Sequence, residues 1–418
     1  MKQKVSGKVL FIALVAALGG ILFGYDTAVI SGTTEVVKMQ FGLSTGLEGW
    51  YVGCALIGSI IGVLLAGMMS DFLGRKKTML ISAVLFSVSA IGCAVSADFT
   101  QLVLFRIIGG FGIGIVSIVS PVYISEVSPA EVRGTMVSLY QLFITIGFLL
   151  AYLANFLILK GTSMPDYWRP MLGAEAIPDL LFLVLIFFIP ESPRWLQVRG
   201  QRQDNSEAWA ALREPGILKA VLIGSAIAIL GQFMGVNAVL YYGPKIFADA
   251  GFQDPLFSTV LVGVVNMLTT VIALLIIDKV GRKQLVWWGV GGMIFCLLMI
   301  GLYFLPVTNL PTWFMLTFFL LYVFCTAISI SAVVFVLLSE MYPNRVRGLA
   351  MSIAGFALWV GTYLIGQLTP WMLENLTPAG TFFLFAFMCI PYLVIMYKCV
   401  PDTTGKSLEE IEEYWKKR

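Results

Sequence analysis

The sequence predicts an all-α integral membrane protein with twelve transmembrane helices arranged as two related six-helix bundles. The first observation is composition: of the 418 residues, 59% are hydrophobic and 12% are charged, and the mean hydropathy is +0.90. A soluble protein has roughly 45–50% apolar and about 25% charged residues, so lipid is the expected solvent for this chain. The second observation is a series of twelve apolar stretches, and the third is a repeat of short charged motifs between the two halves.

Six apolar stretches of about 20 residues, the length that crosses a bilayer core of roughly 30 Å, lie in the first half of the chain. They are 9–31, 50–69, 79–97, 102–123, 136–159 and 171–189. The sixth carries Glu175, Pro178 and Asp179, so a count of eleven spans is the alternative if this stretch does not cross the membrane.

Six more stretches of this kind lie in the second half. They are 217–242, 257–277, 285–305, 313–337, 350–372 and 381–400. The expected organisation is an amino-terminal bundle at 1–189, a cytosolic linker at 190–216, a carboxy-terminal bundle at 217–400 and a cytosolic tail at 401–418. The tail has acidic residues early and basic residues late, which suits the dipole of a short amphipathic helix.

The distribution of Lys and Arg predicts that both termini are cytoplasmic, because positive charges collect on that side of a membrane. With twelve spans, one side receives both termini, the even-numbered loops and the linker, and it holds 22 of the 27 basic residues. Lys38, Lys160, Arg169 and Lys245 lie on the other side, and Arg106 lies inside a span. The net charge of +3 is too small to indicate a nucleic-acid partner.

The two halves repeat the same charged motifs at a nearly constant spacing. DFLGRKK at Asp71 recurs as DKVGRKQ at Asp278, in each case after the second span of its half. SEVSPAEVRG, after the fourth span, recurs as SEMYPNRVRG, and PESPRW, after the sixth span, recurs as PDTTGK. Such parallel repeats of a six-helix unit build transporters of the major facilitator type.

Asp26 in the first span and Arg106 in the fourth are surrounded by apolar residues and glycine. A charge inside the membrane costs at least a few kcal/mol, so it normally faces a cavity or a partner, and these two side chains are expected to pair. A proton on Asp26 would dissolve the pair and change which state of the protein is favoured, although a static ion pair that fixes packing is the alternative. The chain has no histidine, so carboxylates must carry any proton chemistry.

No enzyme is indicated, because paired catalytic carboxylates, a nucleophile triad and a cofactor loop are all missing from the sequence. We expect no metal site and no cofactor, since histidine is absent and the six cysteines have no zinc-type spacing. GFGIG at 110–114 has the glycine spacing of a nucleotide loop only superficially, and no strand precedes it. Close helix packing is the expected role of these glycines.

Several long motifs resemble the sugar porter family of the major facilitator superfamily, particularly its bacterial proton-coupled pentose and hexose symporters. They are GGILFGYDTAVISG, DFLGRKK, RIIGGFGIGIVSIVSPVYISEVSPAEVRG, PESPRWL, GVNAVLYYGPKIF, LLSEMYPNRVRG and VPDTTGKSLEEIEE, spread over essentially the whole chain. The resemblance implies two bundles around a central cavity and transport by alternating access. Proton-linked members resemble this chain at both Asp26 and Arg106, and the linker here is shorter than is usual in the family.

The resemblance also implies a sugar site, in which amides return hydrogen bonds to the hydroxyls and an aromatic ring covers the apolar sugar face. The matching positions are Phe23, Gln141, Gln232, Asn237, Tyr241, Asn266, Phe335 and Trp359. For any one amide taken alone, a hydrogen bond between helices is an equal alternative. The chain departs from the common family pattern at Gly231, Ser331, Ala332, Phe335 and Leu358, which removes hydrogen-bond donors and a helix-flexing proline.

A set of closely spaced charges at the cytoplasmic ends of the helices forms a gate in the family, and here it maps onto matching positions. These are Asp71, Arg75, Glu126, Arg133, Glu191 and Arg194 in the first half, and Asp278, Arg282, Glu340 and Arg347 in the second. Simple topology, with positive charge held inside, is the other interpretation of this set. Glu175 and Asp179 could join it or line a water path, and the sequence does not decide between the two.

The function predicted is a monosaccharide:proton symporter of the bacterial inner membrane that works as a monomer. Its partners would be a pentose or hexose, the proton and the lipid bilayer. A facilitative sugar uniporter, in which Asp26 is structural, is the nearest alternative. A sugar receptor or sensor without transport is the other, because the altered tenth and eleventh spans leave it open.

Overall fold

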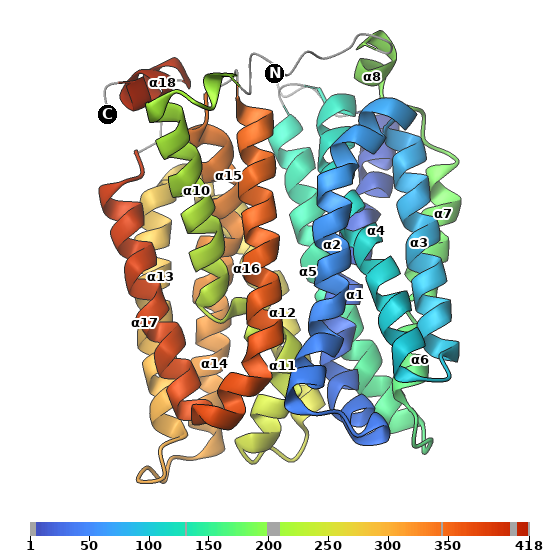
Figure 1. The fold of residues 1–418 in the computed structure, drawn as a ribbon, viewed down its shortest axis with the longest axis vertical. Coiled ribbons are helices and arrows are strands. Elements are labelled where there is room, and N and C mark those ends of the chain that lie inside the picture. The colour runs from blue at the N-terminus through green and yellow to red at the C-terminus, as the bar shows by residue number, and fades with distance from the viewer. Residues whose placement is uncertain (1–5, 130–131, 199–209, 344–345, 402–407, 417–418) are drawn as a thin grey trace. The chain divides into compact units, whose positions relative to one another are not determined.

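The structure is a computed structural model that describes residues 6–129, 132–198, 210–343, 346–401 and 408–416. Every element in these ranges is a helix (Figure 1). Within them, 11 helical segments are long and apolar enough to cross a membrane. The predicted all-α membrane fold is confirmed at the level of its elements.

Five long helices match the first five predicted spans. They are α1 (Gly7–Phe41), α2 (Thr45–Leu73), α3 (Arg75–Val95), α4 (Phe99–Val127) and α5 (Arg133–Gly161). Four of them contain their span and extend beyond it, and α3 ends two residues before its predicted end. Polar caps fix two of the starts, since the side chain of Ser44 accepts a hydrogen bond from the Leu47 amide and that of Asp98 accepts one from the Gln101 amide.

The sixth predicted span differs from the others because two short helices replace one long one. α6 (Trp168–Gly173) ends just before Glu175, and α7 (Ala176–Ile186) begins just after it. Neither is long enough to cross a membrane alone, which explains why 11 segments rather than twelve qualify by length. One face of α7 buries Asp179 and Phe182, while Leu181 and Val184 are exposed as expected for a lipid-facing surface.

The second half follows the same plan with more interruptions. After α8 (Pro193–Val198), its helices are α10 (Pro215–Phe233), α11 (Val236–Asp249), α12 (Pro255–Val280), α13 (Arg282–Tyr303), α14 (Thr312–Thr326), the π-helix η1 (Ala327–Ser331), α15 (Ala332–Met341), α16 (Arg347–Asn375), α17 (Thr377–Lys398) and α18 (Leu408–Lys416). α18 is the amphipathic helix expected in the tail, and its Trp415 donates a hydrogen bond to the Met341 carbonyl at 3.0 Å.

Two predicted spans of the second half are irregular inside. The seventh is split between α10 and α11 at Gly235, whose φ of +88° is a left-handed conformation that favours glycine. A Cβ at Gly235 would also overlap the ring of Phe385. The tenth contains η1 immediately before Ala332, so a π-helical turn interrupts the regular α-helix where the family's proline is missing.

The chain divides into two compact units whose boundaries do not follow the sequence strictly. The first unit comprises Met1–Gln201 together with Leu240–Lys245 and Asp254–Met267, and the second comprises the rest. Two segments from the second half of the sequence therefore pack with the first unit. The bundle, linker and tail boundaries expected from the sequence remain predictions, and residues 199–209, 402–407 and 417–418 of the linker and tail lie outside the described residues.

Glycines bring α2 and α4 into backbone contact. A Cβ at Gly58 would overlap the carbonyl of Ile107, and a Cβ at Gly110 would overlap that of Ala55. The glycine run of α4 therefore serves close helix packing, as predicted, because only a residue without a side chain lets two membrane helices approach this far.

We expect the substitution Gly110→Val to destabilise the protein strongly, because the obstacle is the backbone of α2 rather than a movable side chain. The free energy of unfolding should fall by about 3 kcal/mol or more. Thermal unfolding in detergent micelles measures the effect. Gly67→Val is the matched control, since a Cβ at Gly67 has no heavy atom within 4 Å. Equal melting temperatures for the two variants would contradict the packing argument.

Candidate functional site

The ion pair predicted between Asp26 and Arg106 is present in the interior of the first unit. Nη1 of Arg106, on α4, lies 2.5 Å from Oδ1 of Asp26, on α1, and 3.5 Å from the Asp26 carbonyl. The exposed fractions of the two residues are 1% and 2%. Water does not screen this pair, so a change in its charge has a large effect on its surroundings.

The pair leaves part of its hydrogen-bonding capacity unused. Among the described residues, Oδ2 of Asp26 and Nε of Arg106 have no hydrogen-bond partner. Both residues line a small cavity together with Thr27, Ile30, Val52, Ala55, Leu56, Ile113 and Tyr241. Oδ2 is therefore an acceptor atom of the pair that Arg106 does not use.

Tyr241 lies beside this pair, which the sequence did not indicate. It is buried on α11, within the segment Leu240–Lys245 that belongs to the first unit. The hydroxyl of Tyr152 on α5 donates a hydrogen bond to the Leu240 carbonyl at 3.1 Å and fixes this segment. Tyr241 was predicted as a sugar contact, and here it is a wall of the ion-pair cavity.

Two more carboxyls, Glu175 and Asp179, interact electrostatically with Asp26. Their exposed fractions are 3% and 0%. Both carboxyl oxygens of Asp179, Oε1 of Glu175 and the hydroxyl of Tyr25 have no hydrogen-bond partner among the described residues. The sequence flagged these acids because they interrupt an apolar stretch, but it did not connect them to Asp26.

In the second unit, the amides of the seventh predicted span form a small network. Nδ2 of Asn237 donates to Oε1 of Gln232 at 2.6 Å, and Oγ1 of Thr362 on α16 donates to the same oxygen at 3.2 Å. Trp359, also on α16, is buried with an exposed fraction of 7%. These contacts orient Gln232 so that its amide nitrogen remains the donor group.

The other predicted sugar contacts are distributed over both units. Phe23 on α1 and Gln141 on α5 are half-buried, and Asn266 on α12 is buried with an exposed fraction of 8%. These three belong to the first unit, whereas Gln232, Asn237 and Trp359 belong to the second. The side chain of Phe335 lies outside the described part of the chain.

The predicted charge cluster of the first half is present and tightly bonded. Arg75, at the start of α3, binds Glu126 at the end of α4 through Nε at 3.0 Å and Nη2 at 3.1 Å, and it binds Asp71 through Nη1 at 3.0 Å. Oε1 of Glu191 accepts from the backbone amides of Arg75 and Lys76 at 2.9 and 3.0 Å. Glu191 therefore caps α3 at its positive end.

The repeat reproduces the central bond of this cluster in the second half. Nη2 of Arg282 lies 2.9 Å from Oε1 of Glu340, at the positions that match Arg75 and Glu126. Arg347 donates a hydrogen bond to the Tyr342 carbonyl at 3.3 Å. Arg133 and Arg194 are exposed, and the side chain of Asp278 lies outside the described residues.

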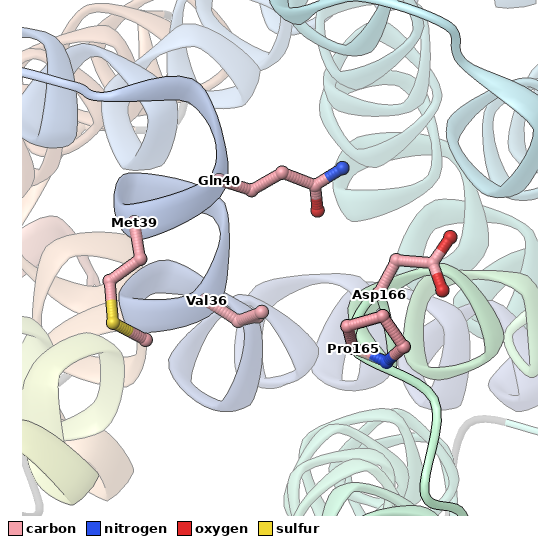
Figure 2. Close-up of a pocket in the computed structure, with 5 residues that line it drawn as sticks. All are labelled: Val36, Met39, Gln40, Pro165 and Asp166. Atoms are coloured by element: carbon pink, nitrogen blue, oxygen red, sulfur yellow. The ribbon is translucent and has the colours of Figure 1, made fainter.

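A second hollow lies at the end of α1, near the segment that connects α5 and α6. Figure 2 shows its lining, which is Val36, Met39, Gln40, Pro165 and Asp166. Gln40 accepts a hydrogen bond from Nε1 of Trp168 at 2.6 Å, and Asp166 accepts one from Nε of Arg169 at 2.8 Å. The polar side chains at this hollow are thus engaged within the protein.

Comparison with known proteins identifies the family. The family model described as sugar (and other) transporter matches residues 12–215 and 201–415. The arabinose-proton symporter of Bacillus subtilis is 38% identical, with 98% of this chain and 95% of the relative covered. The D-xylose-proton symporter of Escherichia coli is 37% identical, with 98% and 96% covered.

Solved structures agree with these matches. The inward-open structure of the xylose transporter XylE from Escherichia coli has a TM-score of 0.86 to this chain at 37% identity, and the match covers 97% of this chain and 100% of the other. The motifs, the helices and the matches along nearly the whole length lead to one family. The chain belongs to the sugar porter family of the major facilitator superfamily.

Proposed function

We propose that this chain is a secondary active transporter that moves a pentose or hexose across the membrane together with a proton, by alternating access. The observation that carries the proposal is the buried ion pair of Asp26 and Arg106 inside a membrane chain of the sugar porter family. The relatives named as arabinose-proton and D-xylose-proton symporters support both the sugar class and the coupling ion.

The proton enters the mechanism at Asp26. Its free Oδ2 takes the proton, the carboxyl becomes neutral, and the attraction to Arg106 weakens. Since α1 and α4 each carry one partner, the change biases the arrangement of these helices and therefore the side to which the sugar site opens.

Glu175 and Asp179 extend this proton site. One guanidinium, that of Arg106, balances only one of three neighbouring buried carboxyls, and leaving the other two ionised would cost several kcal/mol each. A proton on each of the two would remove that cost, so we include both in the proposed proton site. Within the described part of the chain, neither oxygen of Asp179 has a hydrogen-bond partner, so this carboxyl can take up or release a proton without breaking such a bond.

The sugar is held by amide groups and aromatic rings. In the second unit, Gln232 and Asn237 supply hydrogen-bonding groups and Trp359 supplies an aromatic face. In the first unit, Phe23, Gln141 and Asn266 supply contacts. Tyr241 and Phe335 complete the proposed set.

The charge clusters act as the cytoplasmic gate. Helix ends and opposite charges at Arg75, Glu126 and Glu191, repeated at Arg282 and Glu340, stabilise one arrangement of the helix ends and must rearrange in the other. Asp71, Arg133, Arg194, Asp278 and Arg347 belong to the same proposed set.

We also propose that the chain works as a monomer in a bacterial inner membrane with both termini in the cytoplasm. On that side, 22 of the 27 basic residues would lie.

Replacing Asp26 with Asn should abolish sugar accumulation, because the amide cannot take up the proton. We expect wild-type proteoliposomes with an inward proton gradient to concentrate one sugar from a panel of pentoses and hexoses at least about tenfold more than the variant does. Asp166→Asn is the control, as Asp166 is paired with Arg169 away from the ion-pair cavity. Equal, gradient-independent equilibration by both proteins would assign a facilitative uniporter, and sugar binding without uptake would assign a receptor.

Replacing Asp179 with Asn should slow proton-driven uptake about tenfold while sugar counterflow, which needs no net proton movement, keeps its rate. The shape of the side chain is preserved, so packing alone predicts no change in either assay. Both rates are measured in the same proteoliposomes, with Asp166→Asn again as the control. Loss of counterflow together with driven uptake would show that Asp179 is needed for the conformational cycle rather than for the proton.

Removing the carboxylate of Glu126 should destabilise the protein, because Arg75 would stay half-enclosed without its two-point partner. We expect Glu126→Ala to lower the free energy of unfolding by about 3 kcal/mol. Arg133→Ala is the control, since this exposed side chain should change stability by less than about 0.5 kcal/mol. The measurement compares the melting temperatures of the two variants in detergent. A Glu126 variant as stable as the control would mean that these charges only hold positive residues on the cytoplasmic side and do not stabilise the helix ends.

A further inference from the structure

Another buried carboxylate, that of Glu48, binds two lysines at the opposite end of the first unit from the cluster of Arg75 and Glu126. Glu48 lies in the first turn of α2 and its side chain has no exposed surface. Its Oε2 binds Nζ of Lys38, in the last turn of α1, at 2.6 Å. Its Oε1 binds Nζ of Lys245, on α11, at 2.7 Å.

The two lysines come from different parts of the chain. Lys38 is joined to Glu48 through the short connection between α1 and α2, so their bond is local. Lys245 comes from the seventh predicted span and lies ten residues beyond the left-handed turn at Gly235. The bond of Lys245 to Glu48 is therefore one that a rearrangement of α11 must break.

α11 connects this bond to the proton site. Lys245 and Tyr241 are four residues apart and lie on the same face of the helix. Tyr241 lines the cavity of Asp26 and Arg106. A bond that holds Lys245 in place therefore also holds Tyr241 against that cavity.

We propose that Glu48 is a positioning residue for transport: through Lys245 it keeps α11 closed against the ends of α1 and α2, and so keeps Tyr241 over the proton site. Opening of the transporter at this end releases Lys245 from Oε1. Lys38 stays on Oε2 throughout and neutralises the buried carboxylate while the clamp is open. The clamp deepens the proposed alternating access and does not depend on which sugar is carried.

Because each oxygen of Glu48 binds a different lysine, the two bonds can be removed separately. Lys245→Met removes the link to α11 but leaves Glu48 neutralised by Lys38, so no unpaired charge is buried. Lys38→Met is the matched control, because it removes an ion pair of the same geometry that does not involve α11. Glu48→Gln removes both bonds at nearly constant shape.

Hydrogen–deuterium exchange of the full chain in lipid nanodiscs, without sugar, measures the opening of α11. We expect the backbone amides of 240–249 to exchange at least about fivefold faster in Lys245→Met and Glu48→Gln than in the wild type, and at the wild-type rate in Lys38→Met. In a Lys38→Met background, which removes the second lysine from the site, the charge swap Glu48→Lys with Lys245→Glu should return the rate to within about twofold of that background. Such a rescue would show that the bond between positions 48 and 245, rather than the shape of either side chain, protects α11.

The proposal is overturned if Lys245→Met exchanges like the wild type, if Lys38→Met accelerates exchange as much as Lys245→Met, or if the charge swap fails to restore protection. Because no sugar and no proton gradient are present, the result is independent of the transport assays. If the exchange rates support the clamp but the protein accumulates no sugar, the result counts against the proposed symport and leaves the clamp standing.

Discussion

The buried ion pair of Asp26 and Arg106 is the interaction on which the rest of the first unit depends. Taking both charges out of water is costly, and it is tolerated because Nη1 and Oδ1 are 2.5 Å apart in a place that water does not screen. The arrangement is stable in one protonation state only, since a proton on Asp26 leaves the guanidinium of Arg106 unbalanced. Because the site has two charge states, a change of charge can shift the equilibrium between two conformations of the protein.

The helix packing around the pair explains why a local charge change reaches the whole unit. A Cβ at Gly24 would overlap the carbonyl of Ile144, and a Cβ at Gly20 would overlap that of Tyr140, both on α5. α1 therefore touches α5 through backbone rather than through adaptable side chains. Close-packed contacts of this kind do not deform gradually. When the ion pair weakens, the helices therefore move as rigid bodies.

Apolar length predicted the helices, and the cost of a lone charge inside a span predicted that Asp26 and Arg106 pair. The repeated motifs singled out the charges at the helix ends, but they did not say that Arg75 binds Glu126 or that Arg282 binds Glu340. The break before α7 falls where Glu175, Pro178 and Asp179 had left a count of eleven spans open, but the sequence did not show that two short helices meet there. The packing of Leu240–Lys245 with the first unit also escaped prediction, because hydropathy says that a segment is buried but not which neighbours bury it. The same limit hid the approach of Asp179 to Asp26, which lies far away in the sequence.

The two halves share an arginine–glutamate bond at their helix ends, yet they differ in the polar groups that their predicted spans carry. The first unit carries the buried charges, and the second carries the amide network of Gln232 and Asn237. Coupling of a proton to a sugar needs a structure that responds to both. Tyr241 and Lys245 are four residues apart on α11, within the segment Leu240–Lys245 of the first unit, which places a wall of the proton cavity and the Glu48 clamp on one face of this segment. A movement of this segment that alters one of the two contacts therefore alters the other.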